Sequence, residues 1–309
     1  MKVAVLGLGI QGNKRVAIAG TDVAITVDPV NPAATHKAIE EVPLESFECA
    51  LVCTPDGPKL GLLEYLLAHG KHVLVEKPLL AQDETQLSRL HQVANSAGVA
   101  CYTAYNHRFE PHIVHLKQLL AAGTLGTVYK ARFFYGNGTA RDVRLSAWRD
   151  EGCGVLPDLG SHLLDMARFL FGEAIGPFEP WSFNRFENRS FDHVLFGSVG
   201  CSPVLQMEAT LLSWRNTFSL DVYGELGTAH VEGLCKWGPS SFTVRKRVLP
   251  SGKPDQEVHT LECADPTWAV EYDHFKKVCR TGEGNLENDV WISTTLKELA
   301  RSVGREMFV

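Results

Sequence analysis

Short apolar runs alternate with helix-like periodicity over the first hundred residues of the chain. The apolar runs, read as candidate strands, are residues 2–6, 23–27, 49–53, 72–75 and 99–104. The segments between them with helical spacing of apolar residues are 13–19, 58–69 and 83–97. Strands and helices that alternate in this way are typical of a parallel sheet with crossover helices.

The pattern changes after Pro111. A helix is predicted over 112–122, and two more over 268–280 and 288–303. The strand-like stretches between them are 127–135, 193–199, 203–212, 216–223, 227–231 and 241–249. Such a run of strands predicts an α+β domain on a large, mostly antiparallel open sheet. Because 309 residues exceed what one core usually supports, we expect two domains, 1–105 and 106–309.

The first strand runs directly into a G-x-G-x-x-G turn that begins at Gly7. Glycines there let the backbone approach a pyrophosphate, which the amides of the following helix then face. Asp28 ends the next strand, about twenty residues on, where a carboxylate can bind the adenosine ribose. The order of these parts predicts a Rossmann domain. Its expected cofactor contacts here are Gly7, Gly9, Ile10, Gln11, Gly12 and Asp28.

Asp28 also bears on the choice of cofactor. A 2′-phosphate beside its carboxylate would be repelled, and no Arg or Lys occurs in residues 29–31. NAD is therefore favoured over NADP.

Two further segments carry candidate chemistry. Lys77 follows the 72–75 strand at the edge where open α/β sheets bind ligands, although an ordinary surface lysine explains this segment equally well. Asp158 and His162 share one face if their segment is helical, and histidine can accept a hydroxyl proton beside a carboxylate. A helix cap and a solvated histidine are the alternative. The buried stripe of that helix would be Leu159, Leu163, Met166 and Leu170.

Taken together, these motifs resemble one known family. In chain order they are Gly7-x-Gly9-x-x-Gly12, Glu76-Lys77-Pro78, Tyr105-Asn106-His107-Arg108-Phe109, Trp148-Arg149 and Asp158-x-Gly160-x-His162. The chain is similar to the glucose-fructose oxidoreductase / inositol dehydrogenase / MocA (GFO/IDH/MocA) family over nearly its whole length. The resemblance implies an N-terminal Rossmann domain, a C-terminal domain with a large open sheet, and NAD(P)-dependent redox chemistry on sugars, cyclitols or sugar derivatives.

The resemblance also implies residue roles. Lys77 matches the catalytic lysine, and Asp158 and His162 match the acid and the histidine near the reacting hydroxyl. In the oxidative direction His162 would take the hydroxyl proton, Asp158 would orient it, and Lys77 would stabilise charge on the oxygen, with Lys77 and His162 interchangeable. The expected substrate contacts are Lys77, Asn106, Arg108, Asp158 and His162. The remaining expected cofactor contacts are Thr54, Pro55, Glu76, Lys77, Trp148 and Arg149.

Two details of the family pattern concern neighbouring loops. The resemblance implies a cis Lys77–Pro78 bond. Where the family commonly has Thr-Pro-Asn-x-x-His, this chain has Thr54-Pro55-Asp56-Gly57-Pro58-Lys59.

Alternative functions stay open at this point. A catalytically silent NAD(P)- and sugar-sensing regulator is one, although it has no need for three proton-transfer groups. A ketone or imine reductase of the same fold is another. Four arginines, which suit an anionic substrate or else pair with nearby acids, are Arg108, Arg141, Arg144 and Arg149.

Composition narrows the class of partner and the compartment. The net charge of −6 argues against nucleic acid, and the eight cysteines have no spacing typical of a metal site or a disulfide framework. The apolar runs are too short for a membrane span, and the first residues do not resemble a secretory signal, so we expect a cytoplasmic protein. An open sheet leaves one face to cover, which predicts a homodimer or homotetramer.

Overall fold

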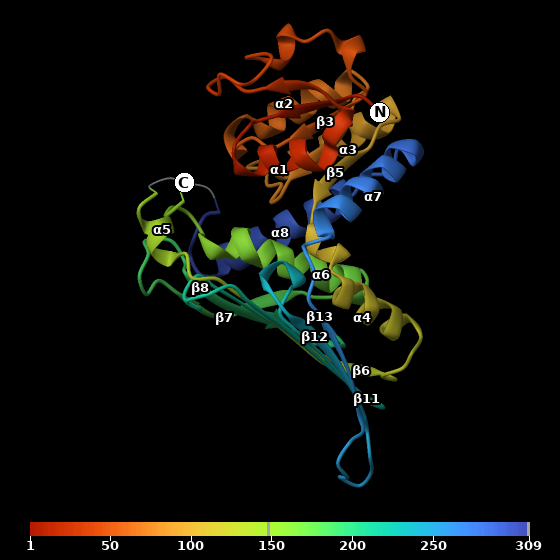
Figure 1. The fold of residues 1–309 in the computed structure, drawn as a ribbon. Helices are drawn as coiled ribbons and strands as arrows, with labels where there is room; N and C mark the ends of the chain where they lie inside the picture. Colours follow the sequence, from red (N-terminus) through yellow and green to blue (C-terminus); the bar gives the residue numbers. More distant parts are fainter. Residues whose placement is uncertain (147–148, 308–309) are drawn as a thin grey trace. The chain divides into compact units, whose positions relative to one another are not determined.

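The computed structural model describes residues 1–146 and 149–307, which form two compact units (Figure 1). The first unit contains residues 1–106 and 267–293, and the second contains 107–266 and the chain from 294 onward. In this division residues 267–293, from late in the chain, group with the first unit. The reason is that helix α7 (Thr267–Thr281) buries Tyr272, Phe275 and Val278 against the first sheet.

The first unit is built on a five-stranded, fully parallel sheet with strand order β2-β1-β3-β4-β5. Its strands are β1 (Val3–Leu6), β2 (Val23–Val27), β3 (Cys49–Val52), β4 (His72–Glu76) and β5 (Cys101–Ala104). Every residue of β1, β3 and β5 is buried, as expected for strands covered on both faces. The predicted Rossmann-type sheet is confirmed.

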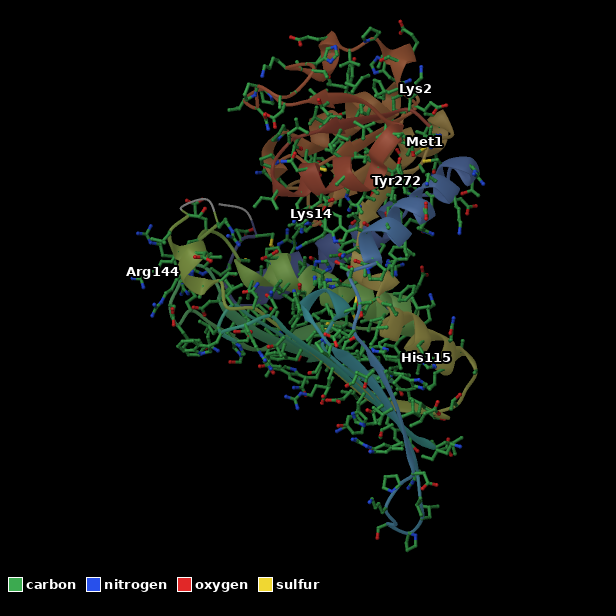
Figure 2. The ribbon with its side chains drawn as sticks, viewed as in Figure 1. Met1, Lys2, Lys14, His115, Arg144 and Tyr272 are labelled. Carbon is green, nitrogen blue, oxygen red and sulfur yellow. The ribbon has the colours of Figure 1, made fainter. Side chains whose placement is uncertain are left out.

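Helices cover both faces of this sheet. They are α1 (Ile10–Ala19), α2 (Asp56–Ala68), α3 (Glu84–Ala97) and α7. α2 and α3 share one apolar cluster, whereas α7 packs with α1 on the opposite face. Figure 2 labels Tyr272 on α7, whose hydroxyl donates to Asp22 Oδ2 at 2.8 Å. A helix from the end of the chain thus completes the layer that α1 begins.

The second unit is built on an eight-stranded sheet with strand order β13-β12-β11-β10-β6-β9-β8-β7. Its strands are β6 (Val128–Gly136), β7 (Phe178–Asn184), β8 (His193–Ser198), β9 (Val204–Thr210), β10 (Thr217–Gly224), β11 (Gly227–Glu232), β12 (Ser240–Lys246) and β13 (Gln256–Leu261). All neighbours are antiparallel except β6 and β9. This confirms the expected large, mostly antiparallel sheet.

Helices cover one face of the second sheet (Figure 1). They are α4 (Pro111–Ala121), α6 (Ser161–Phe171) and the later part of α8 (Leu286–Ser302), while α5 (Ala140–Arg144) is a short separate helix. Along β6 the inward residues Ala131, Phe133 and Tyr135 are buried, and the intervening residues are partly or fully exposed. Within the described residues, no helix combines the length and apolar character needed to cross a membrane.

Two strands and one helix of the second unit were not predicted from the sequence. β7 carries Pro180 beside a register shift, and β13 is an edge strand of mostly exposed residues. Neither segment shows the clean alternation of apolar and polar residues that marks a half-buried strand. α5, with five residues, is too short to show helical periodicity.

Candidate active site

The glycine turn between β1 and α1 is shaped by close backbone contacts. A Cβ on Gly12 would lie 1.8 Å from the Gly7 carbonyl oxygen, and Gly7 itself has a φ of +88°. A Cβ on Gly9, in contrast, would meet nothing within 4 Å. Two glycines are therefore required by packing, and the third leaves open space where a pyrophosphate would approach. The residues present fit a dinucleotide.

The start of α1 suits an anion. Gly9 is the N-cap and offers no side-chain hydrogen bond, and the first turn contains no acidic residue. The free amides of this turn are thus available to phosphate oxygens. Ile10 is 80% exposed, which is unusual for so large an apolar side chain, and Gln11 beside it is also exposed.

Asp28 is fixed at the end of β2 by main-chain amides. Asn31 and Val30 donate to its Oδ1, at 2.8 and 2.9 Å, and Leu8 donates to its Oδ2 at 2.7 Å. These hydrogen bonds, led by those from Asn31 and Leu8, hold the pKa of the carboxyl below its usual value. The Leu8 contact joins the acid directly to the glycine turn.

One basic residue near Asp28 was missed in the sequence. Lys37 donates from Nζ to the Asn31 carbonyl oxygen at 2.9 Å, and its charge also favours the ionised form of Asp28. It comes close because His36 pairs with Val27 as an isolated parallel bridge alongside β2. Lys37 lies six residues beyond Asn31 in the sequence, outside the segment that directly follows β2.

The carboxyl ends of β3 and β4 carry the other expected contacts of the first unit. Thr54 and Pro55 follow β3, and Thr54 Oγ1 is buried with no hydrogen-bond partner among the described residues. Glu76 is the last residue of β4, and Lys77 follows it half-buried, with the expected cis bond to Pro78. Since parallel strands end at the same edge, these groups lie on the side of the sheet that holds the glycine turn.

Glu76 is held by a buried arginine that sequence reasoning missed. Arg15, 1% exposed on α1, donates from Nε to Glu76 Oε1 at 2.7 Å and from Nη2 to Glu271 Oε2 at 2.8 Å. Its guanidinium lies 4.3 Å from the centre of the Trp268 ring. Burial lowers the pKa of Arg15, but the two carboxylates more than offset this, so the net direction is upward. Glu76 is therefore a structural partner as well as a candidate cofactor contact.

Asn106, an expected substrate contact, makes an internal hydrogen bond. Its side-chain amide is 7% exposed and donates to Thr267 Oγ1 at 2.8 Å. The bond ties the end of β5 to the start of α7, within the first unit.

Asp158 and His162 of the second unit lie on a helix that begins irregularly. A π-helical turn over Leu156–Gly160 contains Asp158 and continues into α6, where His162 is the second residue. π-turns inside helices recur at functional sites. Asp158 is therefore not a helix cap, and His162, at 6% exposure, is not a solvated side chain. The predicted stripe of Leu159, Leu163, Met166 and Leu170 is buried.

Three residues beside His162 were missed in the sequence. The ring of His107 stacks on His162 with centroids 4.1 Å apart, and the ring of Tyr135 lies 5.9 Å from His162. Burial first, and then the Asp158 charge, raise the pKa of Tyr135, so Asp158 faces the same cluster. Lys236 Nζ lies 2.9 Å from His107 Nε2, which must accept because an ammonium only donates.

Arg108 forms an ion pair within the second unit. Its Nε lies 2.8 and 3.0 Å from the two oxygens of Asp165, a buried residue one turn beyond His162 on α6. The pair fixes residues 107–109 against α6. Arg149 is half-buried in a turn, while Trp148 lies outside the described residues. In the described part of the chain, no three His, Cys, Asp or Glu side chains are grouped to hold a metal ion, and all eight cysteines are free.

Comparison with protein-family models gives two matches. Residues 1–105 match an oxidoreductase family model with an NAD-binding Rossmann fold, and residues 113–230 match the GFO/IDH/MocA C-terminal domain.

Curated relatives match over part of their length. The scyllo-inositol 2-dehydrogenase (NADP(+)) IolW of Bacillus subtilis is 26% identical over 190 residues, which are 56% of this chain and 52% of the relative. The myo-inositol 2-dehydrogenase of Thermotoga maritima is 29% identical over 45% of this chain and 40% of the relative. The matched segments thus span about half or less of these proteins.

Solved structures share the fold over the whole chain. Levoglucosan dehydrogenase in complex with NADH superposes with a TM-score of 0.85 at 16% identity, covering 98% of this chain and 97% of that one. An oxidoreductase domain protein from Kribbella flavida gives 0.83 at 17% identity, with the same coverage of both chains. At these identities the likeness shows the fold alone.

Proposed function

The chain belongs to the GFO/IDH/MocA family of oxidoreductases, and from that premise we propose a specific activity. It transfers a hydride between a nicotinamide cofactor and a secondary alcohol or ketone carbon. The substrate is a sugar, a cyclitol or a nucleotide-linked sugar, a class supported by the inositol and levoglucosan dehydrogenases among its relatives.

The observation that carries this proposal is the shared carboxyl edge of β1, β2 and β4. That edge holds the glycine turn, Asp28 and Lys77. Their positions support a phosphate site, a ribose site and a proton-transfer group on one sheet. Open α/β sheets bind their ligands at this edge.

The chemistry divides between the cofactor and the side chains. Nicotinamide, when bound, accepts or supplies the hydride. In the oxidative direction His162 takes the proton of the reacting hydroxyl, and Asp158 orients the imidazole. Lys77 donates a hydrogen bond to the same oxygen and stabilises negative charge there. Lys77 and His162 can exchange these roles.

The direct test is NAD reduction by purified protein across a panel of aldoses, inositols and nucleotide sugars. Turnover with any of these classes supports the proposal. NADH oxidation by simple ketones or imines alone supports the reductase instead. Thermal stabilisation by NADH and a sugar without any turnover supports the regulator, since a ligand at 100 times its dissociation constant adds about 2.7 kcal/mol.

For the cofactor we propose that NAD is preferred to NADP. Relatives include an enzyme named for NADP(+) and one bound to NADH, so the preference depends on this chain's own residues. The charged Asp28 repels a 2′-phosphate, whereas Lys37, which hydrogen-bonds Asn31, is a basic group that would attract it.

Asp28→Ser is expected to narrow the NADH preference by at least about tenfold, because repulsion worth about 1.4 kcal/mol or more is removed. The dissociation constants of NADH and NADPH, measured by titration, give the ratio. Adding Lys37→Met to Asp28→Ser should weaken the binding of NADPH again, because the attracting charge is removed. A ratio that stays unchanged in Asp28→Ser would contradict the assignment of this carboxylate. Asp83→Ser, which removes an exposed helix-capping acid, is the matched control.

For the assembly we propose a homodimer or homotetramer that covers the outer face of the second sheet. This face carries the partly exposed Phe134 and Leu195, together with Trp181, which is 48% exposed. Leu195→Lys is expected to shift the protein toward monomer in sedimentation velocity. Leu145→Lys changes a leucine that follows α5 and is 87% exposed. This variant should leave the mass of the sedimenting assembly unchanged. A wild-type monomer at all concentrations would rule out this arrangement.

A further inference from the structure

Lys59 is a buried lysine in an unfavourable place. It lies in the first turn of α2 and is 3% exposed. The positive end of the helix dipole disfavours a cation there, and burial costs an unpaired ammonium several kcal/mol. Neither helix formation nor core packing accounts for a lysine at this position, so the reason must lie in what the ammonium contacts.

The Lys59 ammonium donates to three oxygens. They are Asp56 Oδ1 at 2.6 Å, the Glu76 carbonyl oxygen at 3.1 Å and the Pro78 carbonyl oxygen at 3.1 Å. An ammonium has three hydrogens, and each has an acceptor here. Two of the three acceptors belong to the residues on either side of Lys77.

These two carbonyls lie where the chain leaves the sheet. Glu76 is the last residue of β4 to pair with β5, so the main chain beyond it has no strand partner. Partly buried main-chain carbonyls still need a hydrogen-bond donor where strand pairing ends. Lys59 supplies that donor to both, while Arg15 separately holds the Glu76 side chain.

We propose that Lys59 is a positioning residue for Lys77. By fixing the main chain immediately before and after Lys77, its ammonium sets the direction in which the Lys77 side chain leaves the turn. The inference rests on the proposed role of Lys77 in proton transfer.

Asp56 completes the arrangement. Its side chain is 68% exposed and accepts from Lys59 three residues later on the same helix. A carboxylate in the first turn of a helix is favoured by the dipole, and it balances the charge of Lys59. The cation is thereby held at the turn instead of being drawn into solvent.

The test compares Lys59→Met with Lys71→Met. Lys71 is a matched control in the same unit, because its Nζ also donates to two main-chain carbonyls, Leu44 O at 2.7 Å and Phe47 O at 3.0 Å. Both variants lose a lysine that bridges carbonyls, but only the first loses it at the Lys77 turn. Hydrogen exchange of a peptide covering residues 74–82 reports the turn, and kcat and the NADH dissociation constant report function.

In Lys59→Met we expect exchange at Lys77 and Leu79 to rise roughly tenfold and kcat to fall about 10- to 100-fold, with NADH affinity unchanged. Lys71→Met should change neither the exchange of this peptide nor kcat. Lys59→Gln keeps two donors and should give intermediate values. If Lys59→Met does not fold, Lys59→Gln against Lys71→Gln makes the same comparison.

Two results would overturn the inference. One is unchanged exchange at residues 77 and 79 in Lys59→Met, and the other is a loss of kcat in Lys71→Met as large as that in Lys59→Met. If the wild-type protein turns over no sugar, cyclitol or nucleotide sugar, the proposed function fails instead. The exchange comparison still decides whether Lys59 fixes the turn.

Discussion

Lys77→Met is expected to lower kcat by roughly 10²- to 10⁴-fold, the range associated with loss of a proton-transfer group. The methionine has nearly the length of lysine but can neither donate a hydrogen bond nor carry a proton. The glycine turn and Asp28 are untouched, so NADH should still bind. The measurements are steady-state turnover with the best substrate of the panel and NADH titration by fluorescence.

The control for this variant is Lys276→Met, at a lysine on α7 that is 37% exposed and paired with Asp273. It removes the same functional group from the same unit and should leave turnover as it was. Retained turnover in Lys77→Met would remove Lys77 from the mechanism. If NADH binding and turnover vanish together, Lys77 serves the cofactor site alone.

Arg15→Met is expected to lower the free energy of unfolding by about 3–5 kcal/mol, the usual cost of removing one partner from a buried ion pair. Arg15 is 1% exposed and Glu271 is fully buried, so the substitution removes the Arg15 cation from a buried carboxylate. It also removes the hydrogen bond to Glu76 Oε1. Chemical denaturation followed by circular dichroism measures the change.

A double variant, Arg15→Met with Glu271→Met, separates the lost pair from lost packing. Apolar side chains can replace a buried pair with little net cost, so the double variant should recover much of the stability. If Arg15→Met lowers the free energy of unfolding by less than about 1 kcal/mol, the pair contributes no more than an exposed salt bridge does. That result would contradict the predicted contribution of a buried pair.

The first sheet could be predicted well because its strands obey a local rule. Residues 3–6 and 49–52 are buried on both faces, so they appear as continuous apolar runs bounded by turns. β7 and β13 do not obey such a rule, and their pairing is decided by neighbours distant in sequence. The joining of α7 to the first unit has no local signal at all.

The candidate site likewise contains residues that local spacing predicts and residues that only the folded chain brings together. The glycine turn and Asp28 follow from spacing, because a dinucleotide imposes fixed distances along one βαβ segment. Tyr135 and Lys236 reach His162's neighbourhood only through the folding of the second sheet, so spacing cannot reveal them. Arg15 did have a signal: it shares the buried stripe of α1 with Gly12 and Ala19, and a charge on such a stripe indicates an internal partner.

The late arrival of α7 has a consequence for how this protein is made. Domains generally begin to fold as they emerge from the ribosome, N-terminal part first. Here the first five strands are synthesised before α7, whose Glu271, Tyr272 and Phe275 complete their unit. Residues 107–266 are made between the two. Until then part of the face that α1 begins to cover stays exposed to water, and Arg15 has only one of its two counterions. A fragment ending near residue 105 should therefore expose apolar surface and aggregate more readily than the complete first unit.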